Sequence, residues 1–230
     1  MNNMKRLVVF TGAGMSAESG IPTFRGNDGL WENHRIEDVA TPEAWNRDPE
    51  LVMEFYNQRR KGVLTAQPND GHLKIASWQR DFSVTVVTQN IDDLHERAGS
   101  NDVVHLHGEI RKSRSTVNPE LVYPIEGWSL TLGDRCELGS QLRPHIVWFG
   151  EDVPMLEKAA AIIGEADIFV VVGTSLQVYP AAGLVQYAFR AKQKFIIDPN
   201  AHNLTTKPDW MIVSEGAVNG LSSIEAELLC

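Results

Sequence analysis

The side chains with the clearest chemical capacity follow short apolar runs of the sequence. Asn90 and Asp92 come after the run at 84–87, in a predicted extended loop, and their two-residue spacing lets both point to one side. His107 ends a further apparent strand, and a histidine titrates near the neutral pH at which a general base must work. Simpler explanations stay open, because Asp92 could cap a helix at 93–97 and an isolated histidine is more often structural.

The histidine at 105 is the alternative to His107. The two residues alternate along one predicted strand, so we expect them to share a face. The other histidines are interpreted as structural: His34, His72, His95, His145 and His202.

A glycine-rich turn at 12–14 follows the apolar run at 7–10 and precedes a short helix-forming stretch at 16–19. Two glycines let a backbone approach phosphate groups closely, and the N–H groups and positive end of the next helix would face the negative charge. The same turn is also an ordinary strand-to-helix connection, so by itself it is a weak signal. The following Pro22, Thr23, Phe24 and Arg25 add a rigid turn, an aromatic ring and a cation.

Four further motifs occur in the same chain order as in one known family. They are TQNID at 88–92, HG at 107–108, VWFGE at 147–151 and GTS at 173–175, after VFTGAGMSAESGIPTFR at 9–25. Together they resemble the signature of the sirtuins, the NAD-dependent protein deacylases. Five motifs spread over most of the chain are hard to obtain by chance.

The resemblance implies that NAD is a co-substrate and that the products are free lysine, nicotinamide and 2′-O-acyl-ADP-ribose. It implies three catalytic residues: His107 as the base that removes a ribose hydroxyl proton, with Asn90 and Asp92 holding the nicotinamide carboxamide and ribose. Phe24 would shield the reactive ribose carbon from water. The implied NAD-binding residues are Gly12, Ala13, Gly14, Ser16, Ala17, Phe24, Arg25, Gln89, Asn90, Ile91, Asp92, Gly173, Thr174, Ser175, Asn200 and Ala217.

Tyr56 and Arg59 lie on one face of a predicted helix that begins at Asp48-Pro49. Taken alone they could be an ordinary surface pair. They match, however, the Tyr-X-X-Arg of sirtuins that remove negatively charged acyl groups, and Ala40 matches a small residue that leaves room for a longer acyl chain. A phenol and a guanidinium can bind a carboxylate by charge-assisted hydrogen bonds. We therefore expect a desuccinylase and demalonylase with weaker deacetylase activity.

The acyl-lysine side chains of proteins are the expected partners. The peptide would add as a short strand between the loop at 147–151 and the segment at 177–179, held by backbone hydrogen bonds. The other residues expected to bind substrate are Val147, Phe149, Glu151 and Tyr179.

Composition excludes several classes of partner. The 230 residues carry a formal charge of -9, so the long-range field repels nucleic acid and anionic membranes. Only two cysteines, Cys136 and Cys230, are present, too few for a disulfide framework or a cysteine zinc site. The apolar run at 7–10 is too short for a secretory signal, and no run approaches a membrane span. We expect a soluble, cytoplasmic monomer.

Short apolar runs alternate with helical patterns, which predicts an α/β fold with a doubly wound, Rossmann-like parallel sheet and a smaller inserted domain. The predicted strands are 7–10, 84–87, 146–149, 168–172, 195–197 and 210–213, with helices at 154–163 and 181–190. The NAD-binding domain is expected to comprise 1–25, 73–109 and 146–230, and the smaller domain 26–72 and 110–145.

The second insert departs from most sirtuins, which hold a structural zinc ion there with four cysteines. Here the stretch has only Cys136, so we expect no metal. The module would then be held by its own apolar residues, namely Val122, Tyr123, Ile125, Trp128, Leu130 and Leu132.

Two other functions stay open. An NAD glycohydrolase or ADP-ribosyltransferase would use the same ribose chemistry with another acceptor. A non-catalytic NAD or ADP-ribose sensor would keep the glycine turn without needing His107, Asn90 and Asp92.

Overall fold

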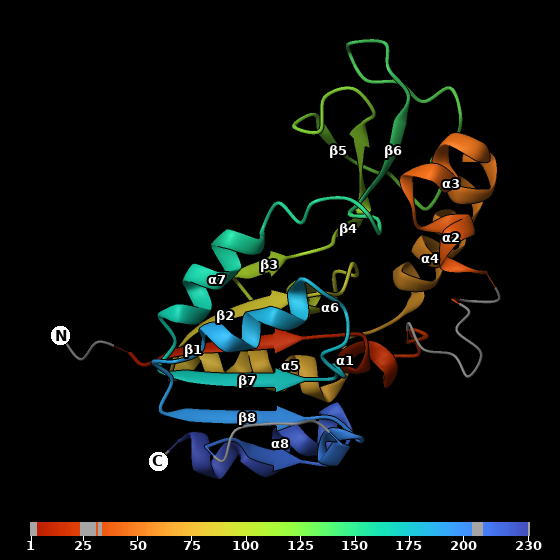
Figure 1. Ribbon diagram of the computed structural model, residues 1–230. Coiled ribbons are helices and arrows are strands. Elements are labelled where there is room, and N and C mark those ends of the chain that lie inside the picture. Colours follow the sequence, from red (N-terminus) through yellow and green to blue (C-terminus); the bar gives the residue numbers. More distant parts are fainter. Residues whose placement is uncertain (1–3, 24–30, 32–33, 204–208, 230) are drawn as a thin grey trace.

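The larger part of the molecule is built on a six-stranded parallel sheet. A computed structural model describes residues 4–23, 31, 34–203 and 209–229 (Figure 1). The strand order is β3-β2-β1-β7-β8-β9, which confirms the predicted doubly wound parallel sheet. The strands are β1 (Arg6–Thr11), β2 (Ser83–Thr88), β3 (Val103–His105), β7 (Ile168–Val172), β8 (Gln193–Ile197) and β9 (Met211–Val213).

Both faces of this sheet are covered, because successive strand residues point to opposite sides. Leu7 and Val9 of β1 share one core with α5 (Asp70–Ser77) and α8 (Ala217–Leu228). The alternate β1 residues, Val8 and Phe10, share the other core with α7 (Leu156–Gly164) and the 3-10 helix η2 (Ala181–Tyr187). The continuous apolar runs of the sequence therefore reflect burial on two faces.

Two predicted helices differ in detail. The helix expected at 181–190 is a 3-10 helix that ends at Tyr187. The helix expected at 154–163 begins at Leu156, so Pro154 precedes it instead of occupying its first turn. The remaining short elements here are α1 (Gly14–Ala17), η1 (Trp78–Arg80), α6 (Leu94–Arg97) and η3 (Ala201–Asn203).

A smaller unit lies above the large sheet (Figure 1). It combines the antiparallel sheet β5-β4-β6 with three helices. Its elements are α2 (Ile36–Val39), α3 (Pro42–Arg47), α4 (Pro49–Thr65), β4 (Gly108–Ser115), β5 (Val122–Pro124) and β6 (Leu142–Ile146). The boundaries given above for the two domains stay a prediction. Helix α5, which packs on α8 of the large domain, begins at Asp70, close to the predicted boundary at residue 72.

The strand predicted at 146–149 is wrong. The strand at this place is β6, which ends at Ile146 and pairs antiparallel with β4 in the small sheet. Val147 and Phe149 instead donate backbone hydrogen bonds to the carbonyls of His107 and Ala40. An apolar run does not identify its hydrogen-bonding partners, and here these lie in two separate loops.

Half of the six apolar residues predicted to hold the small module together are exposed, so that prediction is wrong for them. Ile125 and Leu130 are buried against Met53 of α4, but Val122, Trp128 and Leu132 are 36%, 40% and 42% exposed. Much of the predicted apolar set therefore faces solvent, and other contacts must fix the module.

Two buried polar side chains of α4 supply those contacts. The Asn57 amide donates to the Leu130 carbonyl and accepts from the Leu130 N–H, each at 2.9 Å. The Arg60 guanidinium donates to the carbonyls of Ile110 at 2.6 Å and Trp128 at 2.8 Å, and to Asn57 at 2.7 Å. We call Asn57 and Arg60 the α4 clamp. It satisfies backbone groups of the module that face α4.

No helix in the described part of the chain is both long and apolar enough to cross a membrane. Likewise, among the described residues, no three or more His, Cys, Asp or Glu side chains are placed to hold a metal ion.

Candidate active site

One cavity of about 620 Å³ lies where the strands of the large sheet end. Its walls come from the loops that follow β1, β2, β7 and β8, and from the small unit. The carboxyl ends of parallel strands are the usual ligand-binding edge of such a sheet.

Every predicted site residue that the structure describes lines this cavity, although Phe24 and Arg25 lie outside the described residues. The predicted NAD-binding set present is Gly12, Ala13, Gly14, Ser16, Ala17, Gln89, Asn90, Ile91, Asp92, Gly173, Thr174, Ser175, Asn200 and Ala217. The predicted base and substrate set present is His107, Ala40, Tyr56, Arg59, Val147, Phe149, Glu151 and Tyr179. The structure brings them together, and their individual roles stay predictions.

The glycines of the turn serve a packing role that the sequence did not suggest. A Cβ atom on Gly14 would lie 2.7 Å from the Cα of Gly173, and one on Gly12 would lie 2.7 Å from the Gly173 carbonyl oxygen. The N–H of Gly14 donates to that same carbonyl at 2.8 Å, and the N–H of Gly12 donates to Val172. These two N–H groups are therefore not free to bind phosphate, and the glycines instead bring two cavity loops into contact.

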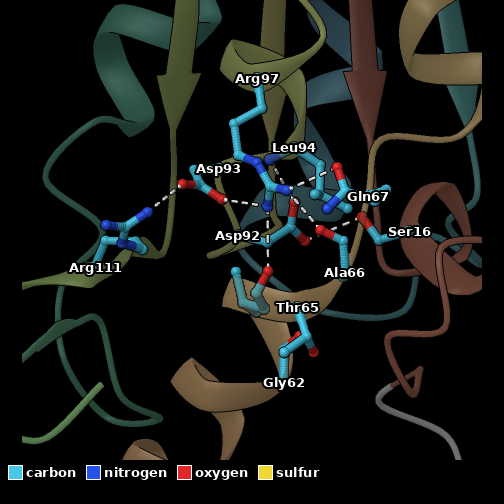
Figure 2. Close-up of polar contacts among 11 residues, drawn as sticks. Ser16, Gly62, Thr65, Ala66, Gln67, Asp92, Asp93, Leu94, Arg97 and Arg111 are labelled. Atoms are coloured by element: carbon cyan, nitrogen blue, oxygen red, sulfur yellow. Dashed lines mark hydrogen bonds and ion pairs between the residues drawn. The ribbon is translucent and has the colours of Figure 1, made fainter. Parts of the chain in front are cut away.

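A buried polar cluster forms the floor beside this turn. Ser16 donates to an Asp92 carboxylate oxygen at 3.0 Å and accepts from the Asn90 amide at 3.1 Å. The other Asp92 oxygen accepts from the N–H of Leu94, the first residue of α6, at 3.2 Å (Figure 2). Burial raises the pKa of Asp92, and the hydrogen bonds from Leu94 and Ser16 oppose that shift.

The next residue, Asp93, faces the other way and ties this loop to its surroundings (Figure 2). One carboxylate oxygen accepts from Arg111 of β4 at 3.0 Å, and the other lies 3.5 Å from Arg97. Arg97 in turn donates to the Ala66 carbonyl at 2.6 Å, just past the end of α4. The loop that bears Asn90 and Asp92 is therefore attached to both β4 and α4.

His107 lies at the cavity wall, with Nδ1 3.1 Å from the Gln89 carbonyl oxygen. Because a carbonyl can only accept, Nδ1 carries the proton and Nε2 is left with a lone pair. Burial lowers the pKa of His107, and the bond to Gln89 opposes this shift only in part. The ring is therefore neutral and basic at Nε2 near neutral pH.

His105 has different surroundings and does not line the cavity. Its Nε2 lies 2.7 Å from a Glu96 carboxylate oxygen, and its Nδ1 lies 2.9 Å from the Asn90 carbonyl. Burial opposes protonation of His105, but these acceptors outweigh it and raise the pKa. The two histidines therefore differ in their partners and in the direction of their pKa shifts, and His107 lines the cavity while His105 does not.

The cavity wall also includes the predicted acyl pair, Tyr56 and Arg59. Tyr56 is fully buried, and its hydroxyl accepts a hydrogen bond from the indole N–H of Trp148 at 3.1 Å. The Arg59 guanidinium carbon lies 4.2 Å from the ring centroid of Trp31. Burial raises the pKa of Tyr56, so the phenol stays protonated.

Glu151 also lines the cavity, but its carboxylate is engaged elsewhere. Arg143 donates to both oxygens at 2.7 and 3.0 Å, and Arg114 donates at 3.1 Å. The Trp148 N–H donates to it at 2.8 Å. These bonds fasten the loop at 147–151 to the small sheet, so any substrate contact by Glu151 would use its backbone.

Sequence reasoning missed several lining residues, among them Trp31, Trp148, Glu18 and Asp198. Asp198 follows β8 at the same sheet edge as the other site residues, and that position was a usable signal. Trp31 carried no signal, because the stretch around it has no clear periodicity.

Comparison with known proteins places the chain in a family. Residues 12–180 match the model of the Sir2 family. The chain belongs to the Sir2 family. It is 50% identical over 231 aligned residues to an NAD-dependent protein deacylase of Bacteroides thetaiotaomicron, covering 98% of this chain and 99% of that protein. An NAD-dependent protein deacylase of Helicobacter pylori is 46% identical over 226 residues, covering 98% of each chain.

Solved Sir2 structures agree with this assignment. A Sir2 homologue in complex with NAD superposes with a TM-score of 0.84 at 39% identity, covering 98% of this chain and 90% of the other. The same fold has been solved with ADP-ribose, with a TM-score of 0.84 at 40% identity, covering 96% and 90%. The resemblance seen in the sequence is confirmed at the level of the Sir2 family and its fold.

Proposed function

We propose that this Sir2 protein is an NAD-dependent protein-lysine deacylase that prefers succinyl-lysine and malonyl-lysine to acetyl-lysine. The observation that carries the proposal is that Tyr56 and Arg59 line the same cavity as His107 and Asn90. A phenol and a positively charged guanidinium in the cavity wall suit an acyl chain that ends in a carboxylate.

The cavity is suited to NAD. Its floor presents the buried Ser16, Asn90 and Asp92, which can hydrogen-bond a carboxamide and ribose hydroxyls. The loops after β7 and β8 add hydroxyl and amide groups at the sheet edge that binds nucleotides in this class of fold. When bound, NAD supplies an electrophilic ribose carbon that accepts the acyl oxygen as nicotinamide leaves.

His107 acts as the base in this proposal. Its Nδ1–H is held by the Gln89 carbonyl, so Nε2 is the atom that accepts a ribose hydroxyl proton. Asp92 and Asn90 are held through Ser16, which limits their rotation and orients them before substrate arrives.

The residues proposed to bind the acyl group are also held in place by their neighbours. Because the Tyr56 oxygen accepts the indole N–H of Trp148, the Tyr56 proton is available for donation to a second acceptor. The small Ala40, buried at 2% exposure, leaves space in the cavity beside this pair. An acetyl group offers no carboxylate to Arg59, which favours the longer acidic substrates.

The decisive test compares Arg59→Met with the unmodified enzyme on succinyl-lysine and acetyl-lysine peptides of one sequence. We expect desuccinylation to fall by about two orders of magnitude or more, since a desolvated charge-assisted pair is lost, while deacetylation changes little. Equal losses on both substrates would refute the acyl preference. His107→Ala serves as the inactive control.

Mass analysis of the nucleotide product separates this function from the alternatives. Acyl-ADP-ribose is expected only from a deacylase. Nicotinamide release without deacylation would indicate an NAD glycohydrolase or ADP-ribosyltransferase, and no NAD turnover would indicate a sensor. The proposed setting is a monomer acting on proteins in the cytoplasm, attracted to basic, lysine-bearing surfaces by the net charge of -9.

A further inference from the structure

Trp31 lies against the positive charge of the proposed acyl pocket. The guanidinium carbon of Arg59 is 4.2 Å from the Trp31 ring centroid, and the Phe55 centroid is 5.8 Å away. Arg59 is only 8% exposed, and both Trp31 and Arg59 line the cavity. Among the described residues, the Trp31 indole is therefore closer to this largely buried cation than the Phe55 ring is.

The indole itself is fixed by its neighbours. Trp31 packs edge-on against Phe55 at 5.0 Å and Tyr56 at 6.3 Å between ring centroids. Its backbone N–H and carbonyl both pair with His34, at 2.8 and 3.0 Å. The ring thus has a defined place beside α4 instead of the freedom of a surface side chain.

A stacked indole stabilises a guanidinium in a particular way. The attraction acts through the flat face of the cation, so it does not occupy the N–H groups at the edge of the guanidinium. A carboxylate ligand, in contrast, is bound through that edge, with two parallel N–H···O bonds. Stacking can therefore hold the charge and fix its plane without using the edge through which a carboxylate binds.

We propose that Trp31 is a specificity-determining positioning residue, whose indole holds Arg59 so that the guanidinium edge receives the terminal carboxylate of the acyl chain. This inference rests on the proposed acyl preference. It adds a residue outside the Tyr-X-X-Arg pair, and one that need not touch the acyl group.

The test uses full-length Trp31→Leu and Trp31→Phe with matched succinyl and acetyl peptides. Leucine removes the aromatic face, so KM for the succinyl peptide is expected to rise roughly threefold to thirtyfold, with kcat and the acetyl KM little changed. Phenylalanine keeps a face and should restore much of the affinity. A purely structural role would change both substrates together.

Trp128→Leu is the matched control. Trp128 stacks with Lys61 of α4 at 5.4 Å, but it does not line the cavity. Removing this second tryptophan–cation pair on the same helix should leave the succinyl-to-acetyl ratio unchanged.

The double variant Trp31→Leu/Arg59→Met completes the design. If Trp31 acts through Arg59, its effect on the succinyl-to-acetyl ratio disappears once Arg59 is gone. Two outcomes would overturn the role of Trp31 but leave the acyl preference standing. In the first, Trp31→Leu still changes the succinyl-to-acetyl ratio when Arg59 is absent. In the second, Arg59→Met changes that ratio and Trp31→Leu does not. If Arg59→Met itself shows no selectivity, the proposed acyl preference fails.

Discussion

Arg60→Met tests whether the α4 clamp holds the small module together. The Arg60 side chain is fully buried, and burial together with the charge of Arg111 lowers its pKa to about 10. Methionine keeps much of the volume and the helix propensity but removes every donor. The carbonyls of Ile110 and Trp128 then lose their partners beneath α4.

The expected loss follows from those two carbonyls. Leaving the buried Ile110 carbonyl unsatisfied costs about 1–3 kcal/mol in the free energy of unfolding, and the partly exposed Trp128 carbonyl adds less because water can reach it. The cost of burying a charge, which methionine avoids, moves the result toward the lower end of that range.

Two measurements address this prediction. Urea unfolding gives the global loss, and amide hydrogen exchange should show faster exchange first in β4 and in the segment around Leu130. Gln58→Met is the matched control, because Gln58 is an exposed neighbour on α4 whose amide donates to Glu54 of the same helix. It should change stability by less than about 0.5 kcal/mol.

Two outcomes would refute the reasoning. The first is a loss for Arg60→Met no larger than that of the control. The second is exchange that rises evenly over both sheets, which would show that Arg60 supports the whole fold and not the module in particular.

Two titrations give further predictions. Because the pKa of His107 is lowered from 6.5, its Nε2 stays unprotonated at pH 6.5 and above. We therefore expect kcat/KM to fall on the acid side only below that pH. A pH–rate profile whose acid limb is centred above 6.5 would contradict the role of His107 as the base. Burial lowers the pKa of His72 to about 4, so between pH 6.5 and 4 the unfolded chain binds more protons than the folded one. The free energy of unfolding should therefore fall by up to about 3 kcal/mol as pH falls through that window. In urea unfolding at several pH values, His72→Gln should weaken this pH dependence. An unchanged dependence would show that His72 is not its source.

Much of the large domain could be predicted from the sequence because its signals are local. The four inner strands of the parallel sheet, β1, β2, β7 and β8, are apolar runs that contribute to both cores, and the glycine turn after β1 has a recognisable spacing. The predicted site residues meet in one cavity because the carboxyl ends of parallel strands share an edge.

The small unit was harder to predict because its contacts are not periodic. The run at 146–149 reads as one strand, yet β6 ends at Ile146 and the next residues hydrogen-bond to two separate loops. Likewise, Gly12 and Gly14 read as a phosphate-binding turn, and nothing local indicates that Gly173 will fill the space beside them.

Helix α4 shows why buried polar residues escape a hydrophobic pattern. A pattern of apolar residues at helical spacing identifies a buried face, but it gives no reason to bury the polar Asn57 and Arg60. The helix is in fact buried on two sides, and successive residues lie about 100° apart around its axis. Tyr56 and Arg59 therefore face the cavity, while the adjacent Asn57 and Arg60 face the module. The residues proposed to select the acyl group and those that anchor the module therefore lie on different faces of one helix, and no pattern of apolar residues alone could separate the two sets.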